Sequence, residues 1–276
     1  MLTPAIYWQL RCLVIASSML IGLLSCGLSP TWGQSASKVP LVLRVLSYNI
    51  HHGEGVDGKL DLERIARVIS SVQPDIVALQ EVDLLVARSQ SIDQPRELAR
   101  LTGMHSVFGA NIDLQGGKYG NAVLARESIS QSHNHLLPNI QQGEQRGVLD
   151  VSLSHRGRTL RLLATHLDHR PDPAERMASI EFINRLMTGP ALAPTILAGD
   201  LNAEFTSAIL DRTREVWKLA NVQRMPTIPV KHPERQIDFI ATLNAQNWQT
   251  REIRVLEEAI ASDHRPIFAV LEYIGQ

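Results

Sequence analysis

The stretch ILAGDLNAE, residues 196–204, decides how the rest of the chain is interpreted. Its first three residues are apolar, as in a buried strand, and this apolar run stops at Gly199. Asp200 and Asn202 follow directly. A rigid core strand holds the groups at its end to the tolerance that an in-line reaction requires. The stretch therefore predicts a functional site at a strand end.

The pattern around this stretch indicates an α/β fold in which strands outnumber helices. Several expected strands follow one another without an intervening helix, which excludes a plain βαβ array and favours two sheets with helices outside both. Strands are expected at 41–50, 76–81, 119–126, 129–137, 147–154, 159–167, 194–200, 236–242, 251–257 and 265–273. Helices are expected at 60–73, 92–102, 172–187 and 207–220.

The first 33 residues differ from the rest. Residues 12–28 carry no charge, Arg11 precedes them, and a small, polar stretch follows, as in a secretory leader cleaved after Gly33. A lipoprotein signal with Cys26 as the lipidated residue and an uncleaved anchor are the alternatives. We therefore expect a leader at 1–33, a short linker at 34–40, one domain at 41–276, and export to the periplasm or the extracellular space.

Composition narrows the class of protein further. The chain has 27 basic and 28 acidic residues and a net charge of −1, so it lacks the basic surplus of a dedicated duplex-DNA binder. Both cysteines, Cys12 and Cys26, lie in the expected leader. The domain after the leader is therefore predicted to contain neither a disulfide nor a thiolate site.

Polar side chains collect at the ends of the expected strands, where loops can converge on a ligand. Each of them alone has an ordinary explanation, such as a turn or a helix cap. Asp238 is the exception because a carboxylate inside an apolar run needs a partner, for which His264 is the candidate. Carboxylate and amide oxygens favour Mg²⁺, Mn²⁺ or Ca²⁺ over Zn²⁺. The set consists of Asn49, Glu81, His166, Asp200, Asn202, Asp238, Asp263 and His264.

Taken in order, seven motifs resemble the endonuclease/exonuclease/phosphatase superfamily of metal-dependent phosphoesterases. The motifs are SYNIHHG, PDIVALQEVD, YGNAVLAR, ATHLDH, LAGDLNAE, QIDFI and SDHRP, and they run from about residue 43 to residue 273. The resemblance implies a DNase I-like four-layer α/β sandwich, in which two mixed β-sheets pack face to face with helices outside. It also implies hydrolysis of a phosphoester.

The resemblance assigns a metal ligand set and a nucleophile site. It implies that Glu81 is the principal Mg²⁺ ligand, with Asn49 close to it and Asp263 at or beside the metal. Mn²⁺ and Ca²⁺ are the alternative ions. It further implies that Asp200 orients or deprotonates the attacking water and that Asn202 positions that water or the phosphate.

The resemblance also assigns the groups that meet the phosphate. It implies that His264 contacts a phosphate oxygen and is paired with Asp238. His166 would hydrogen-bond the phosphoryl group and assist the leaving oxygen.

The motifs around the first strands also look similar to bacterial hydrolases grouped with sphingomyelinase-like and GPI-anchor lipid-remodelling proteins. On that resemblance we expect a monomer that hydrolyses a phosphodiester in a lipid head group or a small phosphoester, with a membrane surface as a further partner. His51, His52, Arg88 and Arg146 are candidates to contact an anionic head group of the substrate. Asn121 is expected to border the site. The alternatives are a secreted nuclease and a non-catalytic binding module. The nuclease is disfavoured because only 5% of residues are aromatic and no basic run appears.

Overall fold

The computed structural model describes residues 40–188 and 193–275. The chain divides into two units, Met1–Lys38 and Val39–Gln276, and the second contains all of the described residues. The expected leader, its cleavage site and most of the linker lie outside the described residues. Among the helices that are described, none is long and apolar enough to cross a membrane.

Twelve strands form two mixed six-stranded sheets. The first sheet contains β1 (Leu41–Asn49), β2 (Ile76–Leu84), β3 (His105–Leu114), β4 (Gly117–Ala125), β11 (Trp248–Val255) and β12 (Ile267–Tyr273), in the order β11-β12-β1-β2-β4-β3. The second contains β5 (Ile129–Leu136), β6 (Gly147–His155), β7 (Arg158–His166), β8 (Thr195–Asp200), β9 (Trp217–Leu219) and β10 (Asp238–Leu243), in the order β5-β6-β7-β8-β10-β9. Each sheet has one parallel pair, β1 with β2 and β7 with β8, and the other neighbours are antiparallel.

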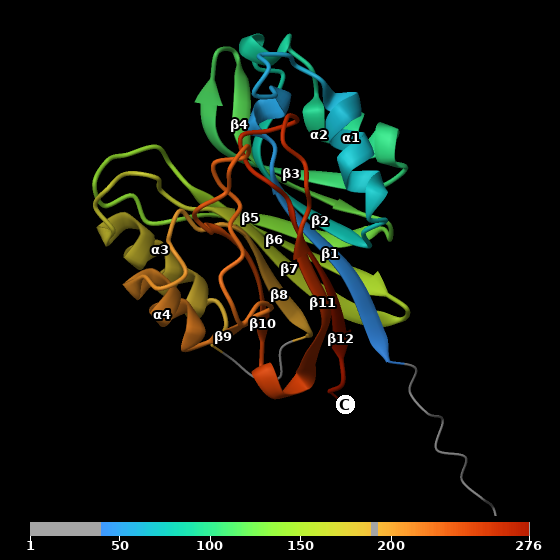
Figure 1. Cartoon of the computed structure of the whole chain (residues 1–276), viewed down its shortest axis with the longest axis vertical. Helices are drawn as coiled ribbons and strands as arrows, with labels where there is room; N and C mark the ends of the chain where they lie inside the picture. Colours follow the sequence, from blue (N-terminus) through green and yellow to red (C-terminus); the bar gives the residue numbers. More distant parts are fainter. Residues whose placement is uncertain (1–39, 189–192, 276) are drawn as a thin grey trace, which may run out of the picture. The chain divides into compact units, whose positions relative to one another are not determined.

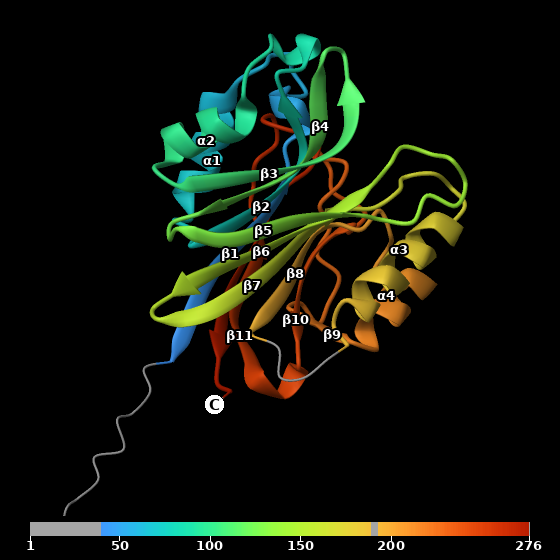
Figure 2. The same cartoon turned by 180° about the vertical axis from the view of Figure 1, so that it is seen from behind.

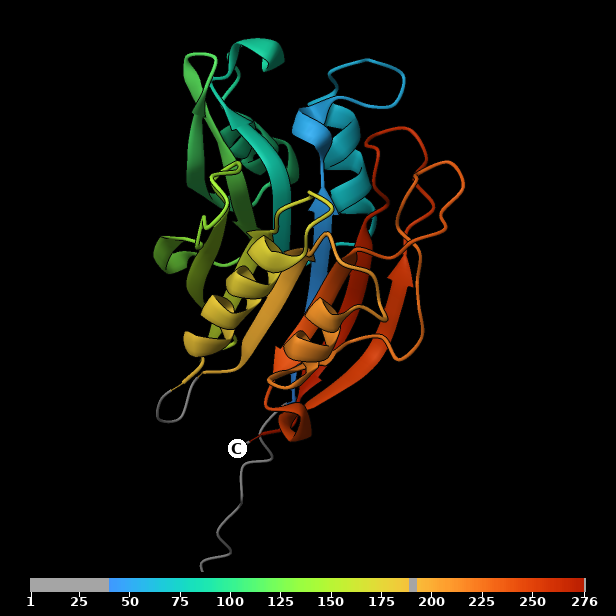
Figure 3. The same ribbon diagram turned by 90° about the vertical axis from the view of Figure 1, so that its left-hand side faces the viewer.

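Four α-helices cover the outer faces of the two sheets (Figures 1 and 2). They are α1 (Leu62–Ser71), α2 (Gln94–Thr102), α3 (Ala174–Arg185) and α4 (Ala208–Arg214). Helices α1 and α2 lie on the first sheet, and α3 and α4 lie side by side across the second (Figure 3). Side-chain caps fix three of the helix starts: Asp61, Asp93 and Ser207 each accept a hydrogen bond from a backbone N–H of the first turn. The 3₁₀ turns are η1 (His51–Gly53), η2 (Ala87–Ser89) and η3 (Ala245–Asn247).

Three apolar clusters separate these four layers. One lies between the sheets and joins residues such as Leu43 and Val45 of β1 to Leu162 of β7 and Ala198 of β8. The second packs the first sheet against α1 and α2, and the third packs the second sheet against α3 and α4. Strands buried on both faces explain the continuous apolar runs in the sequence. The predicted four-layer sandwich is confirmed.

One sequence expectation about the second sheet was wrong. The helix expected at 207–220 ends at Arg214, and Trp217–Leu219 instead form the edge strand β9 beside β10. Burial of Trp217 against the sheet outweighs helix propensity there. The strand expected at 194–200 is confirmed as β8, which runs through Gly199 to Asp200. Glycine is required because a β-carbon at this position would overlap the Thr165 carbonyl of β7.

The first sheet also differs from expectation. Strand β3 (His105–Leu114) was not predicted, because its partly exposed residues lack a regular alternation. It pairs with β4 along its length, with a shift in register between Ala110 and Ile112. The hairpin with β4 thus determines the strand where its own pattern does not.

The edge strand β9 makes a specific prediction about stability. The Trp217 indole N–H donates to Asn184 Oδ1 of α3 at 3.0 Å, whereas the buried indole N–H of Trp248 has no partner among the described residues. Both indoles are buried, so Trp→Phe removes similar volume at each site. We expect W217F to lower the free energy of unfolding by about 1 kcal/mol more than W248F, because only W217F loses a hydrogen bond. Urea denaturation measures both, and an equal or larger loss in W248F would contradict the assignment.

Candidate active site

Strand register aligns three of the predicted site residues on the second sheet. Asp200, the last residue of β8, pairs with His166 of β7 on one side and with Asp238 of β10 on the other. Residues in register on neighbouring strands project to the same face of a sheet. Three residues far apart in the sequence thus meet because three strands begin or end at one level.

The first sheet supplies the opposite side of the site. Asn49 ends β1 beside Gln80 of β2, and Glu81 is the next residue. Glu81 has a backbone φ of 58°, in the left-handed region that non-glycine residues rarely adopt, where the β2–β4 register shifts. Asn49 Nδ2 donates to Glu81 Oε1 at 2.9 Å and to Asp200 Oδ2 at 3.2 Å. One amide therefore joins a carboxylate of each sheet.

His264 is held as a cation by two buried carboxylates. Its Nδ1 lies 2.9 Å from Asp238 Oδ2, and its Nε2 lies 3.7 Å from Asp200 Oδ2. Burial lowers the pKa of His264, but Asp238, Asp200 and Asp263 outweigh it and raise that pKa to about 10. Burial, together with the charge of Asp238, raises the pKa of Asp200 to about 7. Thr227 Oγ1 donates to Asp238 Oδ2 at 2.6 Å and completes this pair.

His166 is held in the opposite protonation state. Its Nδ1 lies 3.2 Å from Arg146 Nη1, and a guanidinium can only donate, so Nδ1 is unprotonated. Burial, with the charge of Arg146 added to it, lowers the pKa of His166 well below its ordinary value. The neutral ring therefore carries its proton on Nε2, whose acceptor is Asp200 Oδ2 at 3.4 Å. Asn202 Nδ2, 3.1 Å from the same nitrogen, is itself a donor, so with this tautomer the two nitrogens are in contact without a hydrogen bond.

Asn202 is placed by its backbone as much as by its side chain. Its N–H donates to Asp200 Oδ1 at 2.9 Å, and its φ of 46° turns the chain away from the strand. Its Nδ2 donates to the Leu167 carbonyl at 3.0 Å. The Asp-x-Asn sequence is thus an Asx turn that also fixes the carboxamide beside His166.

Three other predicted site residues, Asp263, Asn121 and Arg88, make no hydrogen bond to this network among the described residues, whereas the backbone N–H of His51 donates to Asn49 Oδ1 at 3.1 Å. Asp263 accepts a hydrogen bond from Ser262 and touches none of the other site carboxylates among the described residues. Asn121 donates to the Gly147 carbonyl, which joins β4 to β6, and its buried Oδ1 has no partner among the described residues. Arg88 forms a bidentate ion pair with buried Asp83, and its guanidinium carbon lies 5.2 Å from the centre of the Tyr119 ring. His51 groups with His52 and Glu81, with one ligand atom from each within 4.8 Å of the others.

Two residues of the network were not predicted in their observed roles. Arg146 was considered only as a contact for an anionic head group, yet it fixes the tautomer of His166. Thr227 was not predicted at all, because a single threonine in an irregular loop has no recognisable pattern. Only the position of its loop against β10 brings it to Asp238.

The residues present fit a divalent cation. Among the described residues, Glu81 accepts one side-chain hydrogen bond, from Asn49, and forms no ion pair. Asp238 Oδ1 is buried without a hydrogen-bond partner, and Asp200 lies beside it on the neighbouring strand. A concentration of carboxylates with so few cations is stabilised by a bound metal ion. Glu81 and Asn49, with Asp263 nearby, would hold it.

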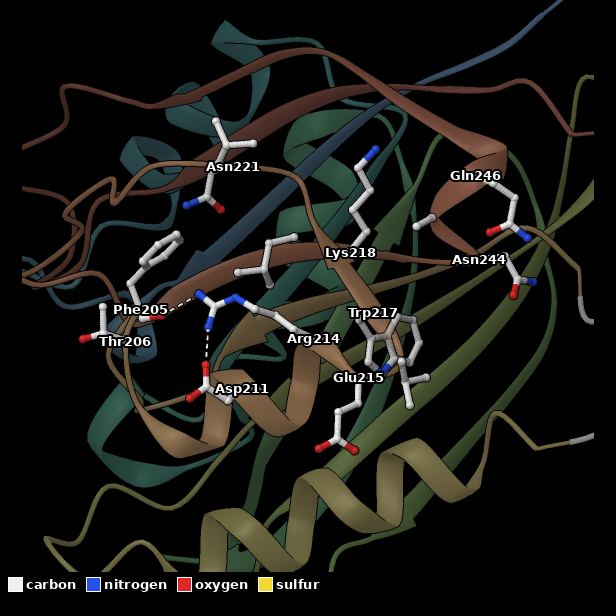
Figure 4. A pocket seen from close by; sticks show the side chains of 14 residues that line it. Phe205, Thr206, Asp211, Arg214, Glu215, Trp217, Lys218, Asn221, Asn244 and Gln246 are labelled. Atoms are coloured by element: carbon white, nitrogen blue, oxygen red, sulfur yellow. Dashed lines mark hydrogen bonds and ion pairs between the residues drawn. The ribbon is translucent and has the colours of Figure 1, made fainter.

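Two hollows border the second sheet. One, of about 630 Å³, borders Asn202 and is lined partly by the basic residues His169, Arg170, Arg176 and Arg235. The other, of about 970 Å³, lies along α4 and β9 and contains none of the predicted site residues (Figure 4). Its Arg214 is paired with Asp211 and the Phe205 carbonyl. Of these two, only the first hollow adjoins the network of predicted site residues.

Comparison with known proteins agrees with this architecture. The sequence profile of the Endonuclease/Exonuclease/phosphatase family matches residues 46–264. The chain therefore belongs to this family, whose members are phosphodiesterases and phosphatases.

The chain is similar to family members with different named activities. It is 28% identical over 189 residues to a 5'-tyrosyl-DNA phosphodiesterase of Caenorhabditis elegans, a match that covers 64% of this chain and 48% of the relative. The chain thus spans about half the length of the curated relatives it matches. An endonuclease/exonuclease/phosphatase structure from Beutenbergia cavernae has a TM-score of 0.71 and 25% identity, covering 85% of this chain and 72% of that chain. A mannosyl-6-phosphatase from Bacteroides thetaiotaomicron shares the fold, with a TM-score of 0.67 at 20% identity and coverage of 83% and 99%.

The hydrogen bond from Thr227 to Asp238 can be tested with a matched pair of isosteric substitutions. T227V leaves a buried carboxylate short of a donor, which should lower the free energy of unfolding by about 1–3 kcal/mol. T242V is the control because Thr242 is also buried on β10 and makes no side-chain hydrogen bond among the described residues. Thermal and urea unfolding compare the two. Equal losses would show that the hydroxyl of Thr227 does not stabilise Asp238.

The role of Arg146 predicts a change in the tautomer of His166. In the wild-type protein, ¹⁵N NMR of the histidine rings should show an unprotonated Nδ1 for His166, identified by its absence in H166Q. R146M removes the donor and should move the resonance toward a mixture of tautomers. R158M, at the other end of β7, should leave it unchanged. An unchanged His166 spectrum in R146M would overturn the assignment.

Proposed function

We propose that this protein is a divalent-metal-dependent phosphodiesterase that cleaves its substrate by in-line attack of water. The observation that carries the proposal is one continuous network: Glu81 and Asp200 share the amide of Asn49, and Asp200 in turn faces two histidines in opposite protonation states. Such a network offers an acceptor for a proton, a donor to an oxygen and a fixed positive charge within one site.

Each group has a role that follows from its contacts. Asp200 has no proton to donate when ionised, so it orients and accepts a proton from water. His264 carries a fixed positive charge, stabilised by Asp238, that offsets negative charge on a phosphoryl oxygen. Neutral His166 presents an Nε2–H donor toward the same region, and Asn202 positions the phosphate beside it.

The bound cation would be held by Glu81 and Asn49, with Asp263 beside them. When present, it supplies Lewis-acid polarisation of the phosphoryl group and relieves the repulsion between a phosphodiester and its nucleophile. Asn49 orients Glu81 for that task through the 2.9 Å hydrogen bond. Mg²⁺ is the ion expected from the oxygen donors, with Mn²⁺ or Ca²⁺ as alternatives.

For the substrate, we propose a lipid head group or another small phosphodiester. The hollow beside Asn202 supports this because it is about the size of a small ligand site and is lined by more basic than acidic side chains, although Arg170 is paired with Asp168. Arg235 lines it and forms no ion pair among the described residues, so its charge is available to an anionic group. Arg88 of η2 and His51 of η1 stay proposed substrate contacts, with Asn121 bordering the site.

A nuclease-type activity is the second candidate. Its support is the similarity to a relative named 5'-tyrosyl-DNA phosphodiesterase. The near-neutral charge of the chain and its few aromatic residues oppose it. A non-catalytic binding module is less well supported, because such a module would normally have lost some of the named site residues, and all of them are present in the sequence.

We also propose that the protein acts outside the cytoplasm as a monomer, with a membrane surface as its setting. The support is the charge-free run at residues 12–28. Fractionation of cells expressing the full chain, with mass spectrometry of its N-terminus, would distinguish a cleaved, lipidated or retained leader.

Removal of divalent ions should abolish turnover. EDTA treatment of the purified full-length chain is expected to lower hydrolysis of bis-p-nitrophenyl phosphate by about 10²-fold or more, and added Mg²⁺ or Mn²⁺ should restore it. D200N and H264Q should lower the rate by a similar factor while remaining folded. D211N, on α4, is the matched control and should keep wild-type activity. Full turnover in EDTA would refute the proposal.

The substrate class is tested with the same preparation. Sphingomyelin, phosphatidylinositol, plasmid DNA and a 5'-tyrosyl oligonucleotide are offered in parallel with Mg²⁺. Release of a phosphorylated head group is the expected result. Cleavage of the nucleic acids with the lipids untouched would establish the second candidate instead.

A further inference from the structure

Beside the catalytic network lies a group of side chains with the composition of a transition-metal site. His51, His52 and Glu81 each offer one ligand atom, and these atoms lie within 4.8 Å of one another. Imidazole nitrogen binds divalent transition-metal ions, whereas Mg²⁺ prefers oxygen. We infer that His51, His52 and Glu81 bind a divalent transition-metal ion through mixed nitrogen and oxygen ligands. The inference rests on the proposed function in so far as Glu81 is the carboxylate that serves the cation there.

The first observation is the orientation of His51. Its Nδ1 lies 3.0 Å from the Glu54 carbonyl oxygen. A carbonyl only accepts hydrogen bonds, so Nδ1 carries the proton and Nε2 presents its lone pair. An imidazole that donates from one nitrogen to a backbone carbonyl while the other nitrogen is free is the usual state of a histidine ligand.

The second observation is the unsatisfied nitrogen of His52. The residue is only 9% exposed, and its Nδ1 has no hydrogen-bond partner among the described residues. Its Nε2 lies 3.7 Å from Glu54 Oε2. Buried polar atoms normally have a partner, and an orphaned one is commonly explained by an ion or a water molecule. A metal ion between the histidines and Glu81 would satisfy this nitrogen.

The third observation is that the ligands are held in place by the fold. The buried side chain of Gln94 donates to the His52 carbonyl at 2.6 Å and accepts from the Asp83 N–H at 2.9 Å. Asp83 lies two residues after Glu81 on β2. One side chain thus ties the turn that carries the histidines to the strand that carries the carboxylate, which lowers the cost of assembling the site.

The backbone conformation of the three residues also supports a metal site. All three residues of the group have positive φ: 45° at His51, 44° at His52 and 58° at Glu81. Non-glycine residues in this region cluster at functional sites, where the surrounding structure maintains them. No other group of three histidine and acidic ligand atoms that includes two histidines is present in the described part of the chain.

The test is direct detection of nitrogen in the coordination sphere. Pulsed EPR of Mn²⁺ bound to the full-length chain is expected to show ¹⁴N modulation from imidazole. Because even outer-shell partners of a ligand contribute about 10–100-fold to affinity, H51Q and H52Q should each weaken Mn²⁺ binding at least tenfold. Mg²⁺ affinity, measured by competition, should change much less. The double variant H133Q/H135Q is the matched control, since these neighbouring rings on β5 also lie close to a carboxylate, Asp150.

The outcomes separate this inference from the proposed function. Nitrogen modulation that disappears in H51Q supports the site, and circular dichroism confirms that the variant is folded. If H52Q unfolds, the loss or persistence of ¹⁴N modulation in H51Q decides whether the histidines bind the metal ion. Absence of ¹⁴N modulation in the wild type, or its persistence in H51Q, overturns the inference even when Mg²⁺-dependent hydrolysis is intact. Conversely, nitrogen-bound Mn²⁺ in a protein that hydrolyses nothing would refute the proposed function and leave the metal site standing.

Discussion

The site depends on one amide group that is shared between two sheets. Asn49 Nδ2 donates both to Glu81, on the first sheet, and to Asp200, on the second. Two carboxylates that face each other at strand ends, one of them buried, repel each other and need donors or a cation. Asn49 meets part of that need only because the apolar cluster between the sheets sets their separation. The packing of the core between the sheets therefore also determines whether the charges of the site can be stabilised.

The same constraint explains why two histidines in one site differ in charge. His264 lies against the buried carboxylate of Asp238 and is cationic, with its pKa raised to about 10. His166 lies against the guanidinium of Arg146 and is neutral. Asp200 faces both rings, from neighbouring positions at the strand ends. Asp238 thus makes His264 the fixed positive charge of the site, and Arg146 makes His166 its neutral hydrogen-bond donor.

The sequence predicted those features that a short stretch of residues specifies, and it missed those that depend on long-range contacts. Asn49, Asp200 and Asp238 were identified because each is a polar residue at the end of, or within, a strongly apolar strand, and strand ends meet by register. Strand β9 was predicted as helix because its pairing with β10 is a long-range contact that outweighs local propensity. Thr227 and the tautomer-setting role of Arg146 depend on where loops fold back. No local pattern specifies that placement.

The central claim is that Glu81 and Asp200, from different sheets, face one cation-dependent centre. Crystals of the full-length chain grown with Mn²⁺ test it through the anomalous difference map. We expect a peak beside the Glu81 carboxylate, within reach of Asn49 and on the side of the network that faces Asp200. A Mn²⁺ peak only at a surface site away from these residues, or Glu81 and Asp200 side chains pointing into separate regions, would contradict the account.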